Sequence, residues 1–201
     1  MKKVLYIAPH RANRAPSQRF RFEQYIDFLK EKGYDYTFSN LLSAQQDKMF
    51  YGDGNTIKKF LLLLQKFFYR LNDVIKARNY DLVFIQREAY FLGPAFFEFL
   101  LSKIKTPLIF DFDDSIWLPN VSNANKKFNI LKNYGKTAKI IKYADMIFAG
   151  NAYLANYAGN YNKNIKIIPT TIDTDEYVNI FDKKDKNKVV IGWSGSITTI
   201  Q

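Results

Sequence analysis

The sequence has no cysteine among its 201 residues and one histidine, His10. A disulfide scaffold, a thiolate or multi-histidine metal site and a cysteine nucleophile are therefore excluded. No uninterrupted apolar run reaches the roughly 18 residues that would span a bilayer. The apolar run at 4–8 stops at Pro9, which is too short for a secretory signal and typical of a buried strand. We therefore expect a folded protein in the cytoplasm.

Acidic residues are fewer than basic ones. The chain has 30 Lys and Arg against 19 Asp and Glu, which gives a net charge of +11. A positive field of this size favours polyanions such as nucleic acid, anionic lipid or phosphorylated substrates. A lysine-rich but merely solvated surface explains most of the lysines equally well.

Short apolar runs alternate with longer amphipathic ones along the chain. Continuous apolar strands separated by helices are typical of a parallel sheet covered on both faces, here a doubly wound, Rossmann-like α/β domain. Its ligands should bind at the carboxyl ends of the strands, where the strand order reverses. The predicted strands are 4–8, 34–38, 82–86, 108–112, 146–149 and 165–168, and the predicted helices are 18–32, 56–78, 90–104, 126–143 and 152–159.

The sequence predicts a domain boundary close to the end of the chain. Residues 182–188 are polar and charged, like a linker, and 189–196 resemble a new strand that enters a Gly/Ser turn. Such a turn normally opens a βα unit. We therefore expect one domain over 1–181, a linker over 182–188 and the truncated start of a second domain over 189–201. The alternative is a last edge strand of a single domain.

The loop after the first strand is rich in arginine. Four of the seven arginines, Arg11, Arg14, Arg19 and Arg21, lie within eleven residues at the predicted ligand-binding edge. Ser17 is positioned to cap the following helix, and guanidinium groups beside a helix N-terminus suit a phosphate or carboxylate. The alternative is a merely basic surface loop. His10, where the first strand ends, is a candidate substrate contact.

Three carboxylates end the fourth predicted strand: Asp111, Asp113 and Asp114. They could hold sugar hydroxyls or act as a base, bind a divalent cation, or pair with the arginines of the first loop. We favour polar substrate contacts together with arginine pairing. Capping of the following turn by Asp114 is a purely structural alternative.

The segment 56–71 predicts an unusual helix. Apolar residues cover most of it, and Lys58, Lys59, Lys66 and Arg70 interrupt them. A basic, aromatic-rich helix of this kind can lie on an anionic bilayer surface. The alternative is a core helix with a broad buried face.

Six short motifs in this order resemble the N-terminal half of a GT-B glycosyltransferase of the broad, retaining family 4. The resemblance covers nearly the whole chain, although Thr170 and Thr171 stand where the family usually has Asn and Gly. The motifs are A-P-H at 8–10, P-S-Q-R-F-R at 16–21, F-D-F-D-D-S-I-W at 110–117, A-D-M-I-F-A-G-N at 144–151, I-I-P-T-T-I-D at 167–173 and I-G-W-S-G-S at 191–196.

The resemblance implies an acceptor-binding domain that faces a nucleotide-sugar domain across a cleft. Asp113 and Asp114 would be its catalytic candidates, and Gly195 and Ser196 would lie near the donor diphosphate. No metal and no cofactor would be needed, since positive side chains and backbone donors stabilise the leaving diphosphate. The acceptor side would be lined by His10, Arg14, Ser17, Arg19 and Arg21.

The implied activity is transfer of a sugar from a nucleotide-sugar to a glycan or lipid-linked acceptor, in surface polysaccharide synthesis, with possible contact to the inner face of the cell membrane. The family's donor-binding residues would follow Gln201, so we expect residues 1–201 alone to be inactive. The main alternative is a non-catalytic domain that binds an anionic ligand or a membrane surface. No nucleic-acid motif is present, so nucleic acid is not an expected partner.

Overall fold

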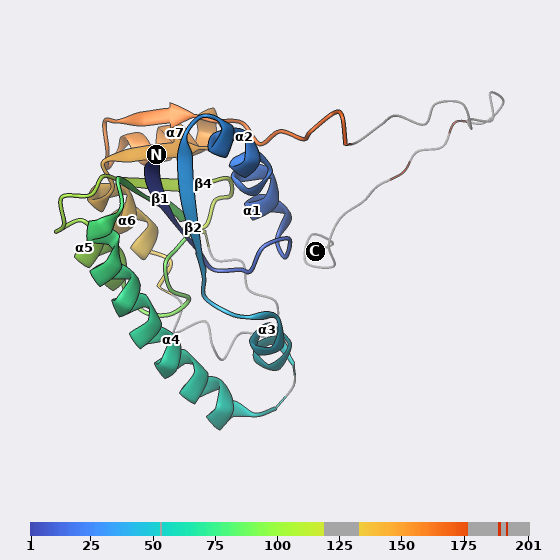
Figure 1. The fold of residues 1–201 in the computed structure, drawn as a ribbon, viewed down its shortest axis with the longest axis vertical. Helices are drawn as coiled ribbons and strands as arrows, with labels where there is room; N and C mark the ends of the chain where they lie inside the picture. Colours follow the sequence, from blue (N-terminus) through green and yellow to red (C-terminus); the bar gives the residue numbers. More distant parts are fainter. Residues whose placement is uncertain (53, 119–132, 177–188, 190–191, 193–201) are drawn as a thin grey trace.

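A computed structural model of the chain describes residues 1–52, 54–118, 133–176, 189 and 192. Within them, six strands form one parallel sheet in the order β2-β1-β3-β4-β5-β6 (Figure 1). The predicted doubly wound α/β fold is thus confirmed. The strands are β1 (Lys2–Ala8), β2 (Tyr34–Asn40), β3 (Leu82–Gln86), β4 (Leu108–Phe112), β5 (Met146–Ala149) and β6 (Ile165–Ile167).

Helices connect the successive strands. Because β2 lies on one side of β1 and β3–β6 lie on the other, right-handed crossovers place the first connection on one face of the sheet and the later ones on the opposite face. The elements between strands are α1 (Pro16–Arg21), η1 (Glu23–Tyr25), α2 (Ile26–Glu31), α3 (Ala44–Tyr51), α4 (Thr56–Lys76), η2 (Ala77–Asn79), α5 (Phe96–Leu101), α6 (Lys136–Tyr143) and α7 (Ala152–Gly159), where η marks a 3₁₀ turn.

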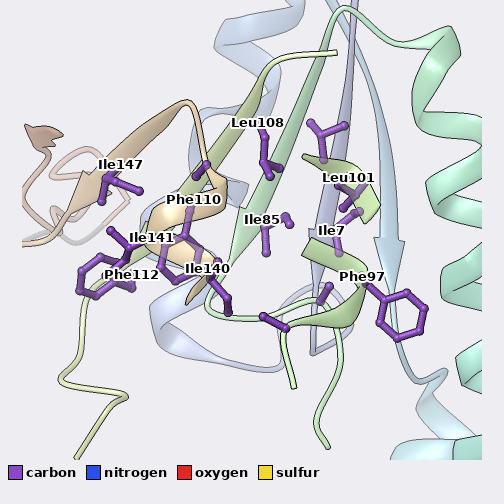
Figure 2. Close-up of a cluster of buried hydrophobic side chains, with 14 of the residues drawn as sticks. Ile7, Ile85, Phe97, Leu101, Leu108, Phe110, Phe112, Ile140, Ile141 and Ile147 are labelled. Carbon is purple, nitrogen blue, oxygen red and sulfur yellow. The ribbon is translucent and has the colours of Figure 1, made fainter. Parts of the chain in front are cut away.

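The two faces of the sheet carry different cores. Beneath α5, α6 and α7, aliphatic and phenylalanine side chains from the central strands form the larger cluster, part of which Figure 2 shows around Ile85 and Phe110. On the other face a smaller aromatic cluster joins α1 to the sheet. There Phe22 stacks on Tyr6, with ring centroids 4.9 Å apart.

The predicted helix 18–32 is in fact broken into α1, η1 and α2. The break falls at Phe22, whose φ of −144° lies outside the helical range. Its ring is buried against Tyr6 and Phe84 in the aromatic cluster. Tertiary packing of one aromatic side chain therefore outweighs the helical spacing that the sequence shows.

The predicted helix 90–104 is shorter than expected. Gly93 has a positive φ of 73° and precedes Pro94, so residues 90–95 form a loop and α5 begins at Phe96. Of the predicted helix 126–143, residues 136–143 are helical, and 126–132 lie outside the described residues.

The helix α3 was not predicted. Ser43 accepts a hydrogen bond from the Gln46 backbone N–H, and the Gln46 side chain accepts one from the Ser43 N–H, which forms a capping box. This S-x-x-Q signal is present in the sequence and could have identified the helix. The helix matters because it brings Asp47 to the edge of the sheet described next.

Candidate functional site

The order of strands reverses between β1 and β3, and the loops that follow these strands meet at the carboxyl edge of the sheet. Open α/β sheets bind ligands at such a point, because adjacent loops diverge there. The loop after β4 joins the same edge, since Arg87 N–H donates to the Asp111 carbonyl at 2.8 Å. The candidate site is built on these three loops.

His10 lies at the end of β1. Its Nδ1 is buried and has no hydrogen-bond partner among the described residues. Its ring centroid is 6.2 Å from that of Phe91, in the loop after β3. Burial lowers the pKa of His10, and the positive charges of Arg14 and Arg87 lower it further, partly opposed by Asp47. The neutral imidazole is thus favoured, and the ring lies within the field of two arginines.

Arg14 reaches the site from the loop after β1. Its Nε donates to the Asp47 carboxylate of α3 at 2.8 Å, and the guanidinium lies 5.6 Å from the centre of the Tyr51 ring. The side chain is 41% exposed. This ion pair uses one edge of the guanidinium, and its exposure leaves room for an anion at the other nitrogens.

Arg87 completes a group of three residues that we call the switch-point cluster: His10, Arg14 and Arg87. Arg87 has a φ of 64°, a left-handed conformation that is uncommon for a residue with a side chain. Its Nη1 donates to the exposed Asp114 carboxylate at 3.0 Å. Arg87 was not among the predicted site residues. It directly follows the strand β3 and could have been identified from that position.

Ser17 has a structural environment that differs from the expected one. The helix α1 starts at Pro16 after Ala15, so Ser17 lies inside the first turn and does not cap it, contrary to the prediction. Its hydroxyl donates to Asp113 at 2.6 Å and accepts from the buried Gln86 amide at 2.9 Å. The two bonds link α1 to the ends of β3 and β4.

Gly150, which follows β5, packs closely against Asp113. A Cβ added to Gly150 would lie 3.0 Å from the Cα and 3.3 Å from the Cβ of Asp113. This spacing is tighter than ordinary van der Waals contact, so a side chain at residue 150 would push Asp113 away by a few tenths of an ångström. Ser17 bonds to the carboxylate of Asp113, and Gly150 allows close packing against its Cα and Cβ.

Arg21 and Asp111 form a buried ion pair, which confirms the predicted pairing between the first loop region and the acids of β4. Both side chains are almost completely buried. Arg21 Nε lies 3.1 Å from both carboxylate oxygens, and its terminal nitrogens bond to Asp111 and to the Ile168 carbonyl. Burial raises the pKa of Asp111 to about 6, although Arg21 acts in the opposite direction. Arg21 thus lies inside the fold and does not face the site.

Arg19 and Arg11 are not drawn into the switch-point cluster. The guanidinium of Arg19 lies 4.5 Å from the centre of the Phe20 ring, and Arg11 bonds to the adjacent Ala12 carbonyl. Gly195 and Ser196, together with the linker 182–188, lie outside the described residues. Within the described ranges, no three His, Asp or Glu side chains come together as a metal site would require.

Across the parts of the chain that the structure describes, no helix is long and apolar enough to cross a membrane. No protein-family model matches the chain, and no curated protein sequence matches it significantly. The inference of function therefore depends on the fold, the switch-point cluster and the sequence motifs.

Proposed function

We propose that the chain is the acceptor-binding part of a retaining glycosyltransferase that transfers a sugar from a nucleotide-sugar to a glycan or lipid-linked acceptor. The observation that carries the proposal is the switch-point cluster at the carboxyl edge of a doubly wound sheet. This is the position where such sheets bind ligands. The six motifs of the sequence support the same assignment.

The cluster favours an acceptor that carries a phosphate or a carboxylate. Arg14 and Arg87 each have one carboxylate partner, and both side chains are partly exposed. A guanidinium has five N–H donors, so a single carboxylate does not saturate it. An anion bound between the two arginines would also lie close to His10, because both arginines are near enough to lower the pKa of its imidazole.

We propose Asp113 and Asp114 as the catalytic residues, as the resemblance implies. Asp113 has a fixed position, because Ser17 bonds to it and Gly150 approaches it closely. Asp114 is more exposed and is held by Arg87. A carboxylate positioned beside an anion-binding cluster can orient an acceptor hydroxyl or take its proton.

The proposal is tested with the protein as its gene encodes it. Radiolabelled UDP-, GDP- and ADP-sugars are supplied with lipid-linked and soluble glycan acceptors, and transfer of label is measured. We expect Arg14→Gln and Arg87→Gln each to raise the acceptor KM about tenfold, equivalent to about 1.4 kcal/mol, with a smaller change in kcat. Arg78→Gln is the matched control, because Arg78 is exposed on η2 before β3, away from the carboxyl edge.

Arg21 is not used in this test, because its substitution would disturb the buried pair with Asp111 and not the acceptor alone. Absence of transfer with every donor class would overturn the proposal. If inorganic phosphate still bound and Arg14→Gln weakened its binding, a non-catalytic domain for an anionic ligand would replace it. The same arginine–histidine cluster supports that second candidate.

A further inference from the structure

The helix α4 exposes a large part of its apolar surface to solvent. Figure 1 shows it along the outside of the molecule. Six large apolar residues on one side of it are 46% to 77% exposed, and we call them the outer face of α4. They are Ile57, Phe60, Leu61, Leu64, Phe68 and Ile75.

The opposite side of α4 faces the sheet and includes a buried ion pair. Arg70 and Asp73 are buried there and form an ion pair with a 2.7 Å contact between Nη1 and Oδ2. Arg70 also donates to the carbonyls of Ala8 at 2.8 Å and Ala89 at 2.6 Å.

The same side of α4 also packs apolar residues onto the larger core, with Leu62 buried and Leu71 and Val74 partly buried. The helix therefore contacts the core through one apolar side, as a surface helix usually does, and carries a second apolar surface that the core does not cover.

The outer face extends beyond α4. Phe67, beside it, stacks on Phe96 of α5 with centroids 5.8 Å apart, and Phe96 and Phe99 are themselves 39% exposed. Clustered exposed apolar residues of this size mark an interaction surface, because scattered single residues are the normal case.

The charges around the outer face have one sign. Between residues 54 and 72 the sequence contains four Lys or Arg and no Asp or Glu. Lys58 and Lys76 are exposed along its border. Asp73, the first acid that follows, is buried and paired with Arg70. An apolar stripe bordered by cations and free of acids matches the chemistry of an anionic lipid surface.

We propose that the outer face of α4 docks in the plane of an anionic bilayer, with its apolar side chains at the acyl boundary and its lysines at the headgroups. The 21-residue helix would lie along the surface over about 30 Å, at 1.5 Å per residue. The docking surface is separate from the switch-point cluster and does not depend on the proposed transferase activity.

The test is flotation of the intact chain with vesicles. We expect it to float with vesicles of phosphatidylcholine and phosphatidylglycerol, and much less with phosphatidylcholine alone. Binding should weaken between about 0.1 M and about 1 M salt, because the Debye length falls from about 10 Å to about 3 Å. Lys58→Gln together with Lys76→Gln should reduce binding to anionic vesicles only.

Phe68→Ser should lower the partition coefficient into anionic vesicles about tenfold, since one buried aromatic side chain is removed from the contact. Phe28→Ser is its matched control: Phe28 is 55% exposed on α2, against 61% for Phe68, and lies outside this surface. Both variants should keep the wild-type melting temperature, because both side chains are mostly exposed.

Three results would overturn the proposal. The chain could fail to float with anionic vesicles, or Phe28→Ser could reduce binding as much as Phe68→Ser. Alternatively, the wild type could fail to bind vesicles and sediment as a dimer that Phe68→Ser dissociates. That result would assign the outer face of α4 to contact with a second copy of the chain. None of these results bears on sugar transfer, so the two proposals fail independently.

Discussion

Four arginines at the carboxyl edge of the sheet form two contrasting pairs. Arg21 and Arg70 are buried, and each bonds to a carboxylate and to backbone carbonyls of other elements. Arg14 and Arg87 are partly exposed, and each pairs with one carboxylate. The first pair fixes the loops in place, and the second pair keeps N–H donors exposed that could bind the anion proposed above.

The contrast shows that clustering of arginines in sequence does not separate these roles. Arg14 and Arg21 come from the same arginine-rich stretch, yet only Arg14 faces the site. Arg70 and Arg87 come from separate segments, and one is structural whereas the other belongs to the switch-point cluster. Burial and the number of partners distinguish the roles, and both depend on tertiary structure.

The largest effect should follow loss of a buried arginine. Arg70→Met leaves Asp73 buried without its counter-charge and deprives the Ala8 and Ala89 carbonyls of a donor. We expect the free energy of unfolding, measured with urea, to fall by about 3–5 kcal/mol. Arg78→Met, at an exposed position, should change it by less than about 0.5 kcal/mol.

A double variant divides this effect into its parts. Arg70→Met combined with Asp73→Leu removes both charges, so part of the lost stability should return. If the double variant is as unstable as Arg70→Met, the bonds to carbonyls and not the ion pair account for the loss. The larger contribution of the buried arginine to stability would then come from its hydrogen bonds to backbone carbonyls alone.

A smaller effect, of opposite sign, is expected at Arg87. Its left-handed backbone costs about 1 kcal/mol for a residue with a side chain, so Arg87→Gly should leave stability unchanged or raise it by up to about 1 kcal/mol. The lost surface ion pair with Asp114 offsets little of this gain. Binding of inorganic phosphate, measured by calorimetry, should nevertheless weaken about tenfold.

Arg87→Ala separates backbone strain from side-chain chemistry. It removes the guanidinium but keeps a Cβ at the positive φ, so it should be about 1 kcal/mol less stable than Arg87→Gly and bind phosphate equally weakly. Equal stability of the two variants would show that the backbone is not strained there. The backbone conformation of Arg87 would then give no support for a functional role of this residue.

Much of the fold followed from pattern. All six described strands were predicted. Continuous apolar runs identified β1, β3 and β4 because the sheet buries most of their residues, whereas the edge strands β2 and β6 are half-buried or exposed over most of their length. Helix limits were less predictable wherever a single contact decided them. Phe22 breaks the first helix by packing on Tyr6, and Gly93 with Pro94 delays α5; neither effect is visible in periodicity alone.

The site was only partly predictable. His10 and Arg14 could be selected because they follow the first strand, and Asp111 could be matched with Arg21 because parallel strands end at one edge. Arg87 and Asp47 were missed, although Arg87 directly follows β3 and a capping box marks the start of the helix that carries Asp47. Their proximity to His10 depends on the fold. The apolar side of α4 was visible in sequence, but its outward orientation depends on where Arg70 is bound.

The smallest effect concerns pH and the neutral member of the switch-point cluster. The folded state binds a proton at His10 less readily than the unfolded chain does, because burial, Arg14 and Arg87 lower its pKa against the opposing Asp47. The stability that this residue contributes is therefore present above about pH 6.5 and declines as the pH falls through the lower folded-state pKa. Urea unfolding at a series of pH values should show this decline, and His10→Gln should reduce its slope. A bound dianion would raise the pKa of His10. Binding of sulfate, which keeps its two charges over this range, should therefore tighten as the pH falls from 8 to 6 in wild type but not in His10→Gln. If the variant shows the same pH dependence of binding, His10 does not meet the anion, and the site would be reduced to the two exposed arginines.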